Sequence, residues 1–306
     1  MARQRPYNRP RVPMPMRLTG RDRVILEAIH TFDGMLSLKQ IDRLFFSGDG
    51  KTQPRHRLRT LFTNGFVRMP DAKTIHRVPL GETIYWLGEK GAEVVAESYG
   101  TTLSELSWRR NPRWAQLEHD LAVNDFRLWV QRACAADSQL DLRQWVPETD
   151  FLAYPDTVEF DDGQGHKRKR QVRPDGFFLI ARLRPDRPKP EGFAFMLEID
   201  MATHSNPSFE HHKVRAGLAY LDSEAYRQRF GLRYGRWLVV TTTQQRLDHL
   251  LGQTEKAGGD QLFYFTTFEQ VEKGGLSDPI WLVAGSRELT RLIPNVTVEL
   301  PDRRAN

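Results

Sequence analysis

Apolar residues recur at helical spacing in three consecutive segments near the start of the chain. They predict helices over residues 19–34, 37–45 and 54–64. Thr19 and Asp22 occupy the positions of a capping box, and Ser37 can cap the second, short helix. The third helix has an apolar face that points inward, which leaves basic side chains on its other faces. The apolar face consists of Leu58, Leu61 and Phe62, and the other positions include Arg55, His56, Arg57, Arg59 and Thr60.

Two short strands and a further helix follow. "FVRMP" and "TIYWL" are predicted strands joined by a loop, and the next helix begins near Glu89. The order of helix, helix, helix, strand, loop, strand predicts a winged helix-turn-helix domain over residues 18–106. The alternative is a three-helix bundle whose basic residues only form a solvated face. The predicted DNA contacts are Arg55, Arg57 and Arg59 in the third helix and Lys73 and Arg77, with His76, in the loop.

The second half of the chain mixes helical and extended patterns. A long helix is predicted from Trp114, and extended pieces follow around Glu148, Asp175 and Glu198. A helix over residues 208–227 and the buried-strand sequence "RWLVVTTT" come next. This order predicts an α/β sandwich around a mixed sheet, so the chain as a whole is α+β. The predicted boundaries are a linker near 107–112, the sandwich over 113–296 and a tail over 297–306.

The predicted strand within "FAFMLEIDMATHS" carries two acidic residues. Because side chains on a strand have a period of two, Met196, Glu198 and Asp200 share one face. Buried, unpaired carboxylates are unfavourable, so these acids require cations, hydrogen bonds or a metal. Asp175, after Pro174 on the preceding strand, is a third acid. We therefore expect Asp175, Glu198 and Asp200 to bind Mg²⁺ or Mn²⁺, which can activate water at a phosphodiester. The alternative is that the acids form structural hydrogen bonds.

Composition and charge narrow the class of protein. The 306 residues are 39% hydrophobic and 27% charged, which fits two globular domains. The net charge of +6 favours a polyanionic partner, and nucleic acid is the natural one. The lone cysteine, Cys134, excludes a disulfide framework within the chain and favours the cytoplasm. No apolar run is long enough to predict a membrane span.

The first 17 residues are predicted to be a flexible basic arm. They contain five arginines and no acidic residue, and their prolines disfavour a helix. Such an arm can lie on phosphates or in a minor groove, and the alternative is a solubilising tail. The same choice applies to the run at residues 166–173, "HKRKRQVR", which is either a solvated hairpin or a contact to the DNA backbone. A zinc site at His204, His211 and His212 is disfavoured, because adjacent histidines on a helix point apart.

The residues of the second half resemble those of a known family. "RPDGFFLI", "FMLEIDMATHS", Lys213 and "AYL" at residues 219–221 are similar to the replication-relaxation proteins of bacterial plasmids and integrative elements. The likeness extends from Leu18 to "PIWLV" near the end, and it includes "LEHDLAVNDFRL" at residues 117–128. These proteins resemble the PD-(D/E)XK nuclease superfamily in their second half, and one branch includes relaxases that nick DNA at a transfer origin. The resemblance implies a restriction-endonuclease-like domain with Asp175 and Glu198 as its first and second acids.

The sequence departs from the family's nuclease pattern at one position. Asp200 stands where the pattern has a lysine, two residues after Glu198. Either Lys213 on the following helix replaces that lysine, or Asp200 is a further metal ligand. The candidate catalytic residues are therefore Asp175, Glu198, Asp200 and Lys213. Additional candidates are Glu148, His119 and Asp125, together with Tyr220 as a residue that could form a covalent link to DNA.

These patterns predict a DNA-binding protein of a mobile genetic element that acts in plasmid replication, relaxation or mobilisation. The nuclease-like half would nick DNA with Mg²⁺ or Mn²⁺. The alternative is a non-catalytic regulator of transcription or replication, in which a degenerate nuclease-like domain serves for interaction or dimerisation. The predicted partners are double-stranded DNA, a second copy of the chain, and replication or transfer proteins.

Overall fold

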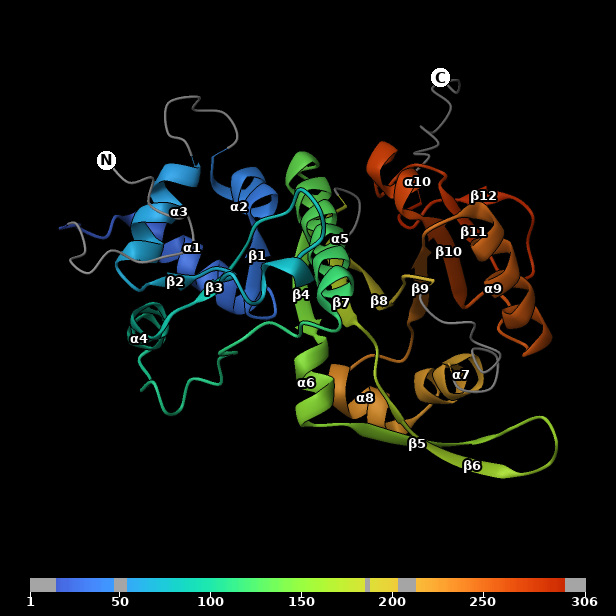
Figure 1. Ribbon diagram of the computed structural model, residues 1–306. Helices are drawn as coiled ribbons and strands as arrows, with labels where there is room; N and C mark the ends of the chain where they lie inside the picture. The colour runs from blue at the N-terminus through green and yellow to red at the C-terminus, as the bar shows by residue number, and fades with distance from the viewer. Residues whose placement is uncertain (1–14, 47–53, 185–187, 203–212, 295–306) are drawn as a thin grey trace, which may run out of the picture. The chain divides into compact units, whose positions relative to one another are not determined.

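The computed structural model describes residues 15–46, 54–184, 188–202 and 213–294 (Figure 1). The contacts between residues divide the chain into two compact units. Unit 1 comprises residues 1–128 and 147–149, and unit 2 comprises residues 129–146 and 150–306. The division falls inside helix α5, Leu117–Ala136, so this helix contributes residues to both units.

Unit 1 contains helices and a small antiparallel sheet. The sheet has the strand order β1-β3-β2. The helices are α1 (Gly20–Thr31), α2 (Leu38–Phe45), α3 (Pro54–Thr63), the short 3₁₀ helix η1 (Ile75–Arg77) and α4 (Glu89–Ser98). The strands are β1 (Met35–Ser37), β2 (Val67–Arg68) and β3 (Ile84–Leu87). The predicted helices, and the two predicted strands with the loop between them, are therefore present.

Helices α1 and α2 begin with the capping residues that the sequence predicts. Thr19 accepts a hydrogen bond from the backbone N–H of Asp22, whose carboxylate accepts one from the Thr19 N–H at 2.6 Å. Ser37 and Gln40 form the same reciprocal cap on α2. Strand β1, which lies between these helices, was not predicted. Its three residues are too few to show an alternating pattern, and they become a strand because β3 pairs with them.

The core of unit 1 fixes the orientation of α3. Leu58, Leu61 and Phe62 are buried, as the apolar face of this helix predicts. They belong to one hydrophobic cluster with Ile25 and Leu26 of α1. Burying such side chains contributes about 1.5–3 kcal/mol each. The opposite side of α3 is consequently held toward solvent.

Unit 2 is built on a seven-stranded mixed sheet with the order β12-β11-β10-β9-β8-β7-β4. β8 pairs antiparallel with β7 and parallel with β9, so the predicted mixed α/β fold class is confirmed. The strands are β4 (Leu140–Pro147), β7 (Gly176–Arg182), β8 (Glu191–Asp200), β9 (Arg236–Thr241), β10 (Phe263–Thr267), β11 (Trp281–Val283) and β12 (Leu289–Thr290). The helices are α6 (Glu148–Ala153), whose first two residues belong to unit 1, α7 (Arg215–Leu221), α8 (Glu224–Phe230), α9 (Gln244–Lys256) and α10 (Phe268–Lys273).

A separate antiparallel hairpin, β5 (Asp156–Asp161) and β6 (Lys167–Val172), packs against α7 (Figure 1). The basic run at residues 166–173 thus lies on the second strand of this hairpin and just beyond it. The predicted single helix over residues 208–227 is wrong in its described part, which forms α7 and α8 instead. The reason is local, because the Ser223 hydroxyl accepts a hydrogen bond from the Tyr226 N–H at 3.1 Å and starts a new helix.

Candidate functional site

Glu198 and Lys213 form a close ion pair in unit 2. The Lys213 ammonium lies 2.7 Å from one carboxylate oxygen of Glu198 and 2.8 Å from the other. Glu198 is near the end of β8, and Lys213 lies just before α7. Burial alone would lower the pKa of Lys213, but the negative charges of Glu198 and Asp175 outweigh it and raise this pKa. Lys213 therefore stays cationic at neutral pH.

Asp175 is held at the same end of β8. Its Oδ2 accepts a hydrogen bond from the Ile199 N–H at 2.6 Å, and its own N–H donates to the Leu197 carbonyl at 2.9 Å. Its side chain is buried, and its charge acts on Lys213. Three of the four predicted catalytic residues, Asp175, Glu198 and Lys213, are thus brought together.

Asp200 has a different set of partners. Both of its carboxylate oxygens accept hydrogen bonds from the Arg246 guanidinium at 2.9 Å, and Oδ2 also accepts one from the Thr241 hydroxyl at 2.7 Å. Burial would raise the pKa of Asp200, but the hydrogen bonds from Arg246 and Thr241 lower it. Asp200 therefore ties the first turn of α9 to the end of β8. The sequence offered no signal for Arg246, because it lies far along the chain from Asp200.

The acidic side chains near Lys213 fit a site for a divalent cation only in part. Among the described residues, no three His, Cys, Asp or Glu side chains lie close enough together to hold a metal ion. Asp175 and Glu198 remain as neighbouring carboxylates, and Mg²⁺ often uses only one or two, with water and phosphate completing its shell. Lys213 already contacts both oxygens of Glu198, so an ion at Glu198 would either displace Lys213 or use the second lone pair of an oxygen. Metal binding by Asp175, Glu198 and Asp200 stays a prediction.

Glu148, His119 and Asp125, the further candidates, lie in unit 1 and have partners there. Glu148 contacts Arg113 at 2.6 Å, and Arg113 also bonds to Asp120. Burial would lower the pKa of Arg113, but its contacts with these two acids raise it. His119 lies 3.7 Å from Asp120. The third candidate forms a looser contact, since an oxygen of Asp125 is 3.4 Å from Arg43.

Tyr220 is enclosed in the core of unit 2. Its side chain is fully buried, and its hydroxyl donates to the carboxylate of Asp156 at 2.5 Å. Arg229 contacts the same carboxylate oxygen at 2.6 Å. Burial and the Asp156 charge raise the pKa of the Tyr220 hydroxyl. A buried, protonated phenol in this position stabilises the fold and is a poor nucleophile. His204, His211 and His212 lie outside the described residues.

The basic residues of α3 differ in how freely they can meet a ligand. Arg55 and His56 are exposed. Arg59 is half-buried, with its guanidinium 5.5 Å from the centroid of the Phe62 ring. Arg57 instead forms a two-contact ion pair with the buried Asp22, in which its Nε donates at 2.7 Å. Arg57 is thereby part of the framework that joins α3 to the start of α1.

The predicted loop between β2 and β3 also presents basic side chains. Lys73, His76 and Arg77 are all exposed, and the latter two lie in η1. Arg17, the last arginine of the predicted arm, is exposed, and its carbonyl accepts a hydrogen bond from Arg57 at 3.1 Å. The other arginines of the arm, Arg3, Arg5, Arg9 and Arg11, lie outside the described residues.

The chain is thus a mixed α/β protein that combines a helix bearing exposed cations with a lysine and two carboxylates gathered at one end of a sheet. The sequence pattern of the replication-relaxation family matches residues 26–232, which is most of the chain. The protein belongs to the replication-relaxation family, and this membership points to a role in the replication or relaxation of plasmids or other mobile elements. Asp175, Glu198 and Lys213 all lie within the matched residues, whereas Arg246 does not.

The other comparisons add no relatives. No curated protein and no solved structure matches the chain. Within the part of the chain that the structure describes, no helix has the length and apolar character to cross a membrane.

Proposed function

We propose that the protein binds double-stranded DNA through unit 1, as a winged helix-turn-helix, and acts in the replication, relaxation or mobilisation of a mobile element. The observation that supports this most is the geometry of α3. Its apolar face is buried, while Arg55, His56 and Arg59 lie on its other faces. A helix held in this way can enter a major groove and place arginines on base edges and phosphates.

The segment between β2 and β3 supports the same surface. β2 follows α3 after a short turn and packs against it. The exposed Lys73 and Arg77 come next in the chain, and they would contact the backbone beside the groove. Family membership agrees with DNA as the partner. We propose two further kinds of partner, which are replication or transfer proteins and a second copy of the chain.

Duplex binding by the whole chain tests this function. We expect affinity to fall steeply with salt, because each neutralised phosphate releases counterions. The double variant Arg55→Gln, Arg59→Gln should bind at least about tenfold more weakly and should lower the salt slope by about two. The control is Arg23→Gln, Lys90→Gln, which removes two exposed cations from α1 and α4. Equal affinities of the two double variants in a fluorescence anisotropy titration would reject α3 as the DNA-contacting helix.

A second candidate function is nicking of DNA by unit 2. The supporting observation is that Asp175, Glu198 and Lys213 gather at one end of β8. Asp175 and Glu198 would hold a Mg²⁺ or Mn²⁺ ion, which supplies activated water and neutralises charge on a phosphodiester. Lys213 would then turn its ammonium from Glu198 toward a phosphate oxygen.

The competing function is a regulator that does not cut DNA. In that case the pairs Glu198 with Lys213 and Asp200 with Arg246 serve only to fasten α7 and α9 to β8. Unit 2 would then act as an interaction or dimerisation module. The two functions differ in whether removal of Asp175 or Glu198 abolishes a metal-dependent activity.

A further inference from the structure

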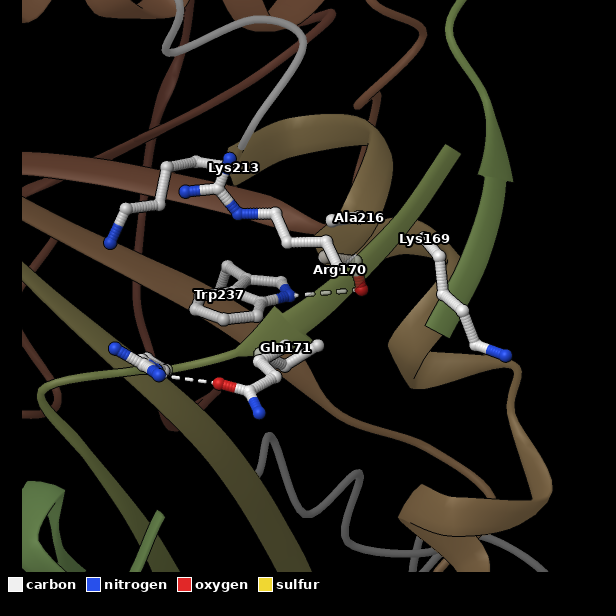
Figure 2. A pocket seen from close by; sticks show the side chains of 9 residues that line it. Lys169, Arg170, Gln171, Lys213, Ala216 and Trp237 are labelled. Atoms are coloured by element: carbon white, nitrogen blue, oxygen red, sulfur yellow. Dashed lines mark hydrogen bonds between the residues drawn. The ribbon is translucent and has the colours of Figure 1, made fainter. Parts of the chain in front are cut away.

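Unit 2 contains a cavity of about 320 Å³ beside Lys213 (Figure 2). It lies between the basic strand of the hairpin, the start of α7 and β9. The lining residues are Lys169, Arg170, Gln171, Val172, Arg173, Lys213, Ala216, Gly217 and Trp237. Four of these carry positive charge, and none of them carries negative charge.

The positive charges that line this cavity are only partly paired with acidic side chains. Lys213 is paired with Glu198, and Lys169 lies 3.3 Å from Glu159. Among the described residues, no side-chain hydrogen bond or ion pair joins Arg170 to another residue, and its backbone pairs with Val158 of β5. Burial lowers the pKa of Arg170, and although the charge of Glu198 opposes this shift, the positive charge of Arg173 adds to it. A ligand with negative charge would relieve this repulsion.

The apolar wall of the cavity is already in place. The Trp237 indole N–H donates to the Gly217 carbonyl at 3.2 Å (Figure 2). The Trp237 ring also stacks with Phe263 at an interplanar angle of 7°. A Cβ atom on Gly217 would lie only 2.9 Å from Trp237 Nε1, so glycine permits this close approach. The cations therefore lie around a recess whose Trp237 wall is already held in place by these contacts.

We propose that this cavity binds a phosphate group of a single nucleic-acid strand. Arg170 and Arg173 would donate charge-assisted hydrogen bonds to the phosphate oxygens, and Lys213 would link the bound phosphate to Glu198. A volume of about 320 Å³ is of the size of one phosphate with its sugar, which favours a single strand over the broad surface of a duplex. The inference rests on the proposed DNA function, and it assigns the hairpin the role of guiding one strand to the carboxylates.

Calorimetric titration of the whole chain with short oligothymidines tests the inference. The double variant Arg170→Gln, Arg173→Gln should bind the single strand at least about tenfold more weakly than the wild type, because each lost charge-assisted contact is worth roughly a factor of ten. The matched control is Arg233→Gln, Lys256→Gln, which removes two exposed charges of unit 2 that lie outside the hairpin and do not line the cavity. It should bind within about twofold of the wild type.

Parallel titrations with thymidine monophosphate and with inorganic phosphate separate the sources of the phosphate. A strand that binds more tightly than either small ligand, with the excess lost in the cavity variant, supports the inference. Equal binding by thymidine monophosphate and the strand would assign the cavity to free nucleotides and overturn it, as would a cavity variant that binds like the control. Duplex affinity of the same variants, which depends on α3, distinguishes failure of the cavity from failure of the DNA-binding function.

Discussion

Asp22→Ala is expected to lower the free energy of unfolding by about 3 kcal/mol, because it breaks a buried ion pair and a helix cap together. The Asp22 carboxylate accepts hydrogen bonds from Thr19 and from Arg57, and its side chain is 1% exposed. Removing it leaves the Arg57 guanidinium without this carboxylate in a half-buried position. Urea unfolding followed by circular dichroism measures the loss.

The same interaction makes the free energy of unfolding depend on pH. Burial would raise the pKa of Asp22, but its hydrogen bonds with Arg57 and Thr19 lower it below the ordinary value of 3.8. The stabilisation by the ionised Asp22 is therefore complete above the pKa that this carboxyl has in the unfolded chain. It is lost as pH falls below that value and through the lower pKa of the folded chain. Asp22→Ala should remove this part of the acid dependence. Arg55→Ala, on the exposed side of α3, should change stability by less than about 0.5 kcal/mol. Equal losses in the two variants would contradict the structural role of the pair.

Asp175→Asn is expected to reduce metal-dependent nicking of supercoiled plasmid by about three orders of magnitude. The amide keeps the hydrogen-bonding shape of the side chain but removes a charge that a divalent ion requires, and such an ion contributes several kcal/mol to phosphodiester cleavage. Glu198→Gln should behave in the same way. The assay compares the conversion of supercoiled to open-circular DNA with Mg²⁺, with Mn²⁺ and with chelator.

The matched control for nicking is Glu269→Gln, which removes an exposed carboxylate of α10 that forms an ion pair with Lys273. It should retain wild-type activity. Nicking that persists in Asp175→Asn and Glu198→Gln would exclude the proposed site. If the wild-type protein does not nick, the regulator that does not cut DNA is the better description of unit 2.

Local patterns in the sequence predicted several features that matter for function. The capping box of Thr19 and Asp22 was correct, because it depends on residues three positions apart. The buried face of α3 was correct for the same reason, since helical spacing alone determines it. The mixed sheet followed from alternating strands and helices, and the family resemblance was confirmed by the match over residues 26–232.

These local patterns could not predict contacts between residues that are far apart in the sequence. The structure pairs Arg57 with Asp22, 35 positions away, whereas its predicted contact with DNA stays a prediction. Asp200 was predicted to bind a metal with Glu198, since both side chains leave the same face of β8, and this stays a prediction. Its contact with Arg246, from a later helix, depends on how α9 packs onto the sheet.

Binding of DNA through α3 and the β2–β3 segment can be tested most directly by hydrogen exchange of the whole chain with and without a duplex. Bound DNA should slow amide exchange in residues 54–63 and 67–87, and Arg55→Gln, Arg59→Gln should abolish the slowing at the same DNA concentration. Slowing confined to unit 2, with no change in these two segments, would contradict DNA binding by unit 1.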